Sequence, residues 1–164
     1  MHEKVRRDAS VERLAPRRYV FHATWALAAP RQRVFCVLAD LERYPDWWPA
    51  FKRAHLVDSN HCDLAVRTLL PITLRFTLER NVEDLTTGLL RATATGDIVG
   101  LVEWQVTTAN NRDTLAQFKE DVTLEHSLAS RLDRAIRPLL EWNHRLAMNS
   151  GAAAGLTCHL RRPD

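Results

Sequence analysis

The chain has 164 residues, of which 46% are hydrophobic, enough for one globular domain with its own core but too few for a second domain. Lys and Arg number 23 against 20 Asp and Glu, and much of the resulting charge of +3 lies in the first 18 residues, so no basic footprint for nucleic acid extends along the chain. No apolar run reaches the roughly 18 residues of a membrane span and the charged N-terminus lacks the apolar stretch of a secretory signal, so a soluble cytoplasmic protein is expected.

The N-terminal segment differs from the rest of the chain. Residues 1–17 are dense in charge, which favours a flexible arm and leaves residues 18–161 as the folded domain. From Tyr19 to Leu27, apolar residues recur with a period of two, as in a strand with one buried face. This alternation predicts the first strand of the domain.

Two short helices are expected after this strand. Pro30 stands where a first helical turn tolerates proline, and the apolar residues that follow predict an amphipathic helix ending near Asp40. In the segment LERYPDWWPAF, residues 41–51, two prolines bracket Trp47 and Trp48 and prevent a long helix. A single turn of helix with bulky aromatic anchors is therefore predicted there.

The remainder divides into a strand-rich part and a final helix. Between residues 53 and 125, six segments alternate apolar and polar residues, and short turns separate them. Consecutive strands joined by short turns predict an antiparallel meander. The last element, from about Ser130 to Leu160, is predicted to be a long helix with a wide apolar arc, and Ser130 and Asp133 have capping-box spacing at its start.

The predicted final helix carries polar and glycine residues within its apolar arc. Asn143 lies in this arc beside one line of the helix, at i, i+4, i+7 and i+11, that comprises His144, Met148, Gly151 and Gly155. Glycine inside a helix costs about 1 kcal/mol relative to alanine, so the two glycines indicate a close approach by another part of the chain. Either the line packs against the sheet, with Asn143 and His144 as hydrogen-bonded core groups, or space remains over it for a ligand that these two residues contact.

Three segments carry a family resemblance: DLERYPDWWPAF (40–51), GDIVGLVEWQV (96–106) and WNHRLAMNSGAAAGL (142–156). Together they resemble the polyketide cyclase/dehydrase and lipid-transport family of the START-like, or SRPBCC, superfamily, over residues 18–161. The resemblance implies the α+β helix-grip fold, in which a seven-stranded antiparallel sheet curves around a long C-terminal helix and two short helices follow strand one. It also implies a cavity between sheet and helix that accepts apolar small molecules, but no single reaction.

Candidate site residues combine this resemblance with the strand alternation. Arg80 shares the predicted inward face of its strand with Phe76, and Glu120 shares that of its strand with Phe118. Because a buried unpaired charge is costly, Arg80 and Glu120 are expected to pair with each other or to meet a polar ligand group, unless they are rim charges exposed to water. Tryptophan could line the cavity or fill the core. The predicted ligand-binding residues are Trp25, Trp47, Trp48, Phe76, Arg80, Trp104, Phe118, Glu120, Asn143, His144, Met148 and Gly151.

The main functional hypothesis is a binder, and possible carrier or modifier, of an apolar or amphipathic small molecule such as a lipid or polyketide. One alternative is a polyketide cyclase, aromatase or dehydratase with His144 and Glu120 as acid–base catalysts, and another is an interaction module with a filled core. Whether the protein is an enzyme is thus left undecided, as are the ligand and the oligomeric state.

No cofactor and no metal site are expected. The group His55, His61 and Cys62 lies around one turn but lacks a fourth partner and the spacing of metal ligands. The three cysteines are far apart along the chain, as is typical of reduced thiols.

Overall fold

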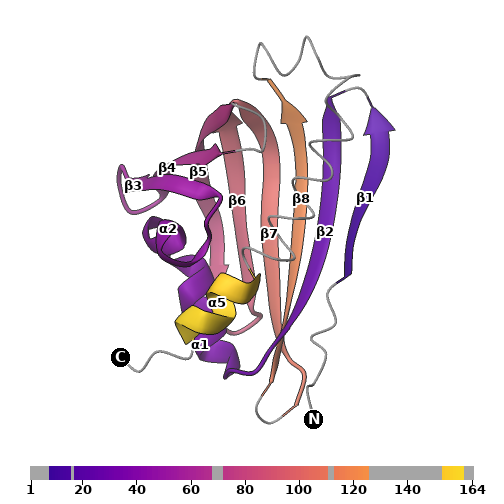
Figure 1. The fold of residues 1–164 in the computed structure, drawn as a ribbon, viewed down its shortest axis with the longest axis vertical. Helices are drawn as coiled ribbons and strands as arrows, with labels where there is room; N and C mark the ends of the chain where they lie inside the picture. Colours follow the sequence, from indigo (N-terminus) through magenta and orange to yellow (C-terminus); the bar gives the residue numbers. More distant parts are fainter. Residues whose placement is uncertain (1–7, 16, 68–71, 111–112, 126–152, 161–164) are drawn as a thin grey trace.

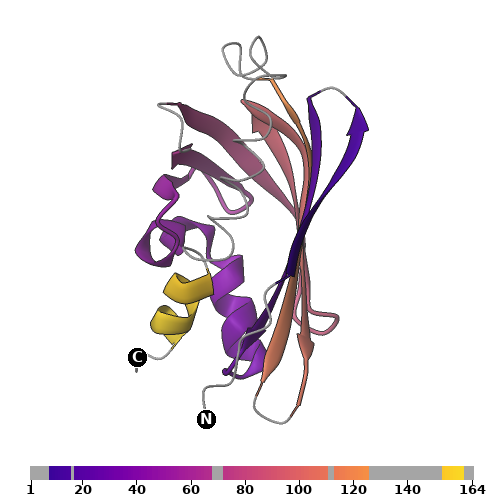
Figure 2. The same ribbon diagram turned by 45° about the vertical axis from the view of Figure 1, so that its right-hand side comes forward.

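One antiparallel sheet of eight strands, in the order β1-β2-β8-β7-β6-β5-β4-β3, forms the framework of the protein (Figure 1). The computed structural model describes residues 8–15, 17–67, 72–110, 113–125 and 153–160. Helices α1, α2 and α5 all lie on the same side of the curved sheet (Figure 2). The elements are β1 Asp8–Ala15, β2 Arg18–Leu27, α1 Arg31–Ala39, the 3-10 turn η1 Leu41–Arg43, α2 Tyr44–Trp47, β3 Phe51–Leu56, β4 His61–Arg67, β5 Thr73–Asp84, β6 Leu89–Gly96, β7 Ile98–Thr108, β8 Thr114–Leu124 and α5 Ala153–Leu160.

The predicted strands and short helices are confirmed from residue 18 to residue 125. β2 covers the first predicted strand, and β3 to β8 are the six strands of the predicted meander. Pro30 takes φ −60° and ψ 141° directly before α1, as expected for a proline that precedes a helix. α2 is a single turn that buries Tyr44 and Trp47, so the prolines of this segment do limit the helix to a short anchor.

The sheet has one strand more than the seven expected. β1 lies within the segment assigned to the N-terminal arm and pairs antiparallel with β2, from Asp8 opposite Thr24 to Ala15 opposite Arg18. The dense charge of this segment argues against folding, but an edge strand is held by backbone hydrogen bonds to a single neighbour and tolerates charged side chains. Residues 8–15 therefore belong to the sheet.

The predicted C-terminal helix is described only over its last eight residues. α5 is helical as expected, whereas residues 130–152, with Asn143, His144, Met148 and Gly151, lie outside the described residues, so the helix length stays a prediction. None of the helices in the described ranges has the length and apolar character that crossing a bilayer requires.

The close approach indicated by glycine is visible at Gly155. A Cβ atom at this position would lie 1.7 Å from the carbonyl oxygen of Trp47, so α5 packs backbone to backbone against α2. Leu156 and Leu160 of α5 are buried in the adjoining core. At this position the glycine accommodates a helix rather than the sheet or a ligand.

Two clusters of buried side chains occupy the inner face of the sheet. The helix-packed cluster lies where α1, α2 and α5 cover the strands, and its members include Trp25, Val34, Trp47, Trp104, Val106, Ala116 and Leu156. The strand-end cluster lies toward the other end of the strands and comprises Tyr19, Phe21, Cys62, Leu64, Leu78, Ala94, Ile98, Val122 and Leu124. The cavity described below touches both clusters.

Candidate ligand cavity

A cavity of about 190 Å³ lies between the inner face of the sheet and the segment from α1 to β3. One buried water needs only about 10–15 Å³ on this scale, so the space is an order of magnitude larger than a single solvent site. Its wall is largely apolar. The aromatic and charged residues that line it are Tyr19, Phe21, Tyr44, Trp48, Phe51, Phe76, Trp104, Phe118, Arg80, Arg91 and Glu120.

Half of the predicted ligand-binding residues lie at this cavity. They are Trp48, Phe76, Arg80, Trp104, Phe118 and Glu120. Trp25 and Trp47 do not line it: Trp25 is 0% exposed and Trp47 3%, and both fill the helix-packed cluster. The four predicted residues of the C-terminal helix lie outside the described residues.

A group of aromatic rings closes the cavity on the side of the helices. The ring of Trp104 packs 4.7 Å from that of Phe118 and 4.9 Å from that of Trp25, and Trp48 meets Trp25 edge-on. Tilted and edge-to-face contacts of this kind add to the gain from burial alone. The indole N–H groups of Trp25, Trp47 and Trp48 are buried with no hydrogen-bond acceptor among the described residues, so these rings contribute through apolar and ring contacts. This wall consists of closely packed aromatic rings.

Tyr44 joins the aromatic wall to α1. Its hydroxyl donates a 2.7 Å hydrogen bond to the backbone oxygen of Leu38, and both residues line the cavity. Burial raises the pKa of Tyr44 far above its usual value, because the charged phenolate would lose its hydration. Tyr44 is therefore a neutral hydrogen-bond donor whose proton is already engaged by the protein.

Arg80 lines the cavity from β5, as its place on the inward face predicted, but its charge is engaged by the protein. One guanidinium nitrogen donates to the backbone oxygen of Ala39 at 3.1 Å, and another forms an ion pair with Glu83. A bulge in β5 leaves Asn81 as an extra residue between Arg80 and the next paired residue. Arg80 thus ties β5 to the end of α1 instead of pairing with Glu120.

Glu120 is the one carboxylate among the described residues that line the cavity. It stands half-buried on β8 between the buried Phe118 and Val122, and its neighbours across the sheet are Phe21 and Val102. Strand alternation placed it correctly on the inner face. A carboxyl group in such a wall can accept a hydrogen bond from a ligand hydroxyl or exchange a proton with a ligand carbon acid.

Several cavity residues are absent from the predicted ligand-binding set, although the strand alternation indicates some of them. Tyr19 and Phe21 share the inward face of β2, so the alternation that selects Phe76 also selects them. Tyr44 and Phe51 lie in the irregular segment around α2, where no period exists and only the folded arrangement reveals which side chains face the cavity.

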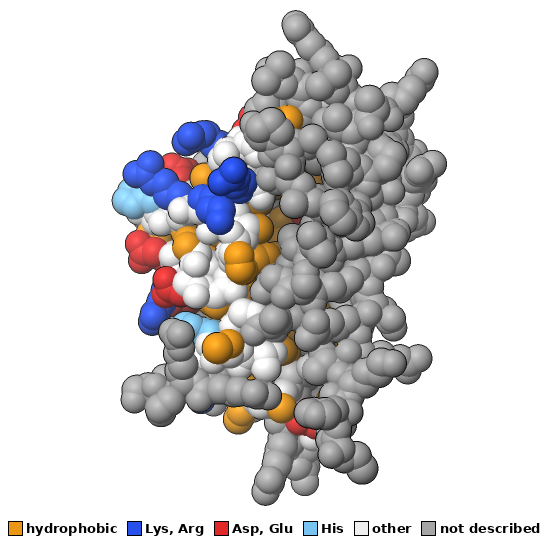
Figure 3. Space-filling view, in the orientation of Figure 1, with side chains coloured by type: hydrophobic (Ala, Val, Ile, Leu, Met, Phe, Trp, Pro, Cys, Tyr) orange, Lys and Arg blue, Asp and Glu red, His pale blue; other side chains and the backbone are white. Residues whose placement is uncertain are grey.

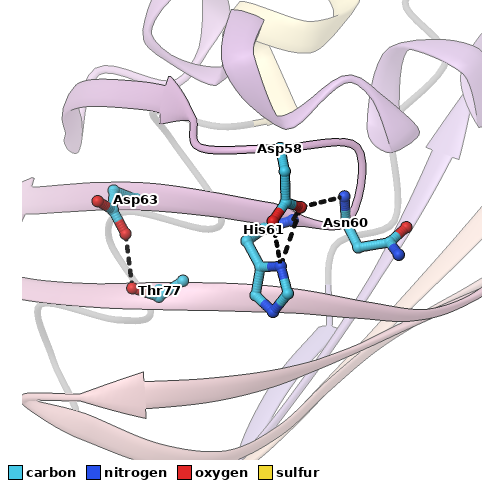
Figure 4. Close-up of polar contacts among 5 residues, drawn as sticks. All are labelled: Asp58, Asn60, His61, Asp63 and Thr77. Atoms are coloured by element: carbon cyan, nitrogen blue, oxygen red, sulfur yellow. Dashed lines mark hydrogen bonds and ion pairs between the residues drawn. The ribbon is translucent and has the colours of Figure 1, made fainter.

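The turn between β3 and β4 has a structural role. Among the described residues, no group of His, Cys, Asp and Glu is arranged to hold a metal ion. Instead, Asp58 accepts hydrogen bonds from the backbone N–H of Asn60 at 2.8 Å and of His61 at 2.9 Å, and it contacts Nδ1 of His61 at 2.9 Å (Figure 4). The hydroxyl of Thr77 donates to Asp63 at 2.6 Å, which links β5 to β4.

The described residues thus form a curved antiparallel sheet with an apolar cavity between it and short helices. The sequence model of the family described as polyketide cyclase / dehydrase and lipid transport matches residues 27–133. This match spans more than half of the chain, and the chain belongs to that family. A search of curated proteins gave no match.

Solved structures share the fold at low sequence identity. The Zhui aromatase/cyclase from Streptomyces sp. R1128 is 20% identical, with 88% of this chain and 94% of that chain covered and a TM-score of 0.66. A START superfamily protein from Mycobacterium smegmatis is 16% identical over 78% and 94% of the two chains, with a TM-score of 0.59. Norcoclaurine synthase from Thalictrum flavum, in complex with dopamine and hydroxybenzaldehyde, is 11% identical over 79% and 84%, with a TM-score of 0.54. At these identities the likeness establishes the fold alone.

Proposed function

We propose that the protein binds an apolar or amphipathic small molecule, of the lipid or polyketide kind, in the cavity between its sheet and its helices. The observation that carries this proposal is a cavity of about 190 Å³ with a mainly apolar wall. Protein cores otherwise pack as densely as organic crystals and leave few voids larger than one water. A filled interaction module would have closed this space with its own side chains.

The wall also favours a particular shape of ligand. The rings of Trp48, Trp104 and Phe118 offer flat apolar surfaces that suit a ring system or an extended chain. Glu120 provides a carboxyl group on the otherwise apolar inner face of β8. A ligand with an apolar body and one hydroxyl or similar donor would match this distribution, because few polar groups fix the orientation of a ligand in an apolar pocket.

Native mass spectrometry before and after organic extraction tests the proposal. A co-purifying mass that extraction removes is expected. The variant Ala92→Phe places a ring in the cavity and should reduce retention of that mass at least tenfold, whereas Thr95→Phe, on the same strand but exposed, should retain it. Equal retention by both variants, with both folded, would count against the cavity as the binding site.

A second candidate function is acid–base catalysis on a polyketide-like substrate. Glu120 favours it, since a carboxyl group in an apolar cavity wall is suited to proton transfer with a bound carbon acid. His144 stays a candidate on sequence grounds and lies outside the described residues. Turnover and binding of a poly-β-ketone substrate should be compared in Glu120→Gln and His144→Ala. Lost turnover with binding retained supports catalysis, and no turnover in the wild type over a broad substrate panel speaks for a binder only.

A further inference from the structure

Four basic side chains gather on the outer face of β3, β4 and β5. This cationic patch consists of Lys52, Arg53, Arg67 and Arg75, all exposed. In the space-filling view, Lys and Arg side chains gather over this part of the molecule (Figure 3). In the described part of the chain, none of the four forms an ion pair, whereas Arg18, Arg43, Arg80 and Arg91 each have a carboxylate partner.

Strand register brings the four cations together. Arg53 on β3 lies opposite Ala65 on β4, which in turn lies opposite Arg75 on β5, so the two arginines are about 10 Å apart across two strand spacings. Arg67 follows Ala65 by two residues and therefore shares its outward face. A bulge inserts Lys52 beside Arg53, which leaves both side chains exposed. The patch thus spans three neighbouring strands.

The patch lies on the other side of the same strands that wall the cavity. Three of its cations directly follow a cavity-lining residue in the sequence, and the pairs are Phe51 and Lys52, Val66 and Arg67, and Leu74 and Arg75. All three pairs lie where β3 begins, β4 ends and β5 begins. Only the sheet itself would therefore separate this end of the cavity from an anionic surface that contacts the patch.

We propose that this cationic patch docks the protein on the surface of a membrane that contains anionic phospholipids. The inference rests on the proposed function, because an apolar ligand has its reservoir in a bilayer rather than in water. An arginine-rich surface whose cations form no ion pairs among the described residues suits lipid phosphates, which guanidinium groups bind in a bidentate manner. Juxtaposed Lys and Arg side chains are attracted to an anionic leaflet within a Debye length. The competing occupant, an acidic protein, becomes an outcome of the test.

Vesicle co-sedimentation of the full chain tests the inference, without any added cavity ligand. The protein should bind vesicles of phosphatidylcholine with phosphatidylglycerol and not vesicles of phosphatidylcholine alone, and about 1 M salt should release it because screening then acts over about 3 Å. Arg53→Gln with Arg75→Gln should weaken partitioning about 30-fold, from the attraction that each basic residue contributes at an anionic surface. Arg43→Gln with Lys119→Gln, which changes the net charge equally on other exposed sites, should leave it within about twofold.

Three results would overturn the inference: equal binding to both kinds of vesicle, equal loss in both double variants, or preferential binding to poly-glutamate over anionic vesicles, which would indicate an acidic protein partner. Cavity binding is followed separately with the fluorescence of anilinonaphthalene sulfonate in vesicle-free solution. Dye binding without vesicle binding rejects the docking surface and keeps the proposed function. Vesicle binding without dye binding keeps the docking surface and rejects the proposed function.

Discussion

The two ends of the sheet's inner face differ in how they are filled. In the helix-packed cluster, side chains from α1, α2 and α5 meet the sheet, and Trp25, Val34, Val106, Ala116 and Leu156 are completely buried. In the strand-end cluster the sheet residues face the cavity, and six of the nine members line it. The same alternation of apolar residues thus forms a solid core around Trp25 and a cavity wall toward the other end, and this wall also includes Trp48, Trp104 and Phe118 of the helix-packed cluster.

The covering helices, and not the strands, therefore decide where the cavity lies. Trp25 and Phe21 share the inward face of β2, four residues apart, yet Trp25 meets Trp48 and Trp104 whereas Phe21 lines the cavity. Close packing gives each buried ring many contacts, and a ring at a cavity has fewer. Loss of a side chain should therefore cost more at the packed end.

The largest effect is expected from truncation of the packed ring. Trp25→Ala should lower the free energy of unfolding by about 3–5 kcal/mol, because it leaves a void that the surrounding rings cannot fill. Phe76→Ala, at the half-buried cavity wall, should cost only about 1–2 kcal/mol, since part of its surface already faces open space. Urea unfolding monitored by tryptophan fluorescence and far-ultraviolet circular dichroism measures both. Similar losses for the two variants would remove the distinction between a packed and a hollow end.

The second-largest loss of stability is expected at the helix contact that closes the packed end. Gly155→Ala would place a Cβ atom 1.7 Å from the carbonyl oxygen of Trp47, so the backbones of α5 and α2 must separate. The strain should exceed the helix-propensity gain of alanine and leave a net loss of about 2 kcal/mol. Cys158→Ala, exposed on the same helix, should change stability by less than about 0.5 kcal/mol. Thermal unfolding of the pair gives the comparison, and a stabilised Gly155→Ala would show that α5 does not pack on α2 in this way.

A smaller loss is expected at the boundary between the two ends. Tyr44→Phe removes the hydroxyl that donates to Leu38, so a buried backbone oxygen loses its partner. The cost should be about 1–2 kcal/mol in urea unfolding. The variant should also loosen the junction of α1 and α2, which hydrogen exchange at the amides of residues 38–48 would report as faster opening. Unchanged exchange together with unchanged stability would mean that the bond contributes nothing to the wall.

The sequence is informative about strands and much less so about the cavity. The alternation in β2 and in β5 to β8 predicts which face each residue takes, and it correctly assigns Phe76, Arg80, Phe118 and Glu120 to the inner face. It cannot separate Trp25 from Trp104, because both point inward and only the position of the helices makes one a core residue and the other a wall residue. The period of two predicts which face of the sheet a side chain takes, whereas the burial of that side chain depends on what covers the face.

Two further differences between the prediction and the structure also arise from contacts between separate parts of the chain. Residues 8–15 carry a charge density that argues against folding, yet their backbone groups complete the edge of the sheet, which composition does not reveal. The Arg80 side chain has the inward position that its strand predicts, but its partners are Glu83 and the carbonyl of Ala39, groups whose distance depends on a bulge and on the end of α1. Which charged groups form ion pairs depends on the folded arrangement, and the alternation of residues along a strand does not predict it.

The smallest effect concerns the turn that joins β3 to β4, beside the strand-end cluster. The hydrogen bond with Asp58 raises the pKa of His61 above its ordinary 6.5, and hydrogen bonds from the backbone of Asn60 and from His61 lower the pKa of Asp58 below its ordinary 3.8. A raised histidine pKa stabilises the fold at low pH, and the contribution is lost as the pH rises through the folded value. A lowered aspartate pKa stabilises it at higher pH, and that contribution is lost as the pH falls through the folded value.

The turn is therefore held best between these two ordinary values, and Asp58→Asn should remove the effect. In nuclear magnetic resonance titrations the variant should bring the pKa of His61 down toward 6.5. Glu79→Gln serves as the matched control, because Glu79 raises the pKa of His61 through a weaker electrostatic effect and its loss should lower that pKa less. An equal or larger change in the control would mean that general surface charge, and not the hydrogen bond with Asp58, sets the protonation of this turn.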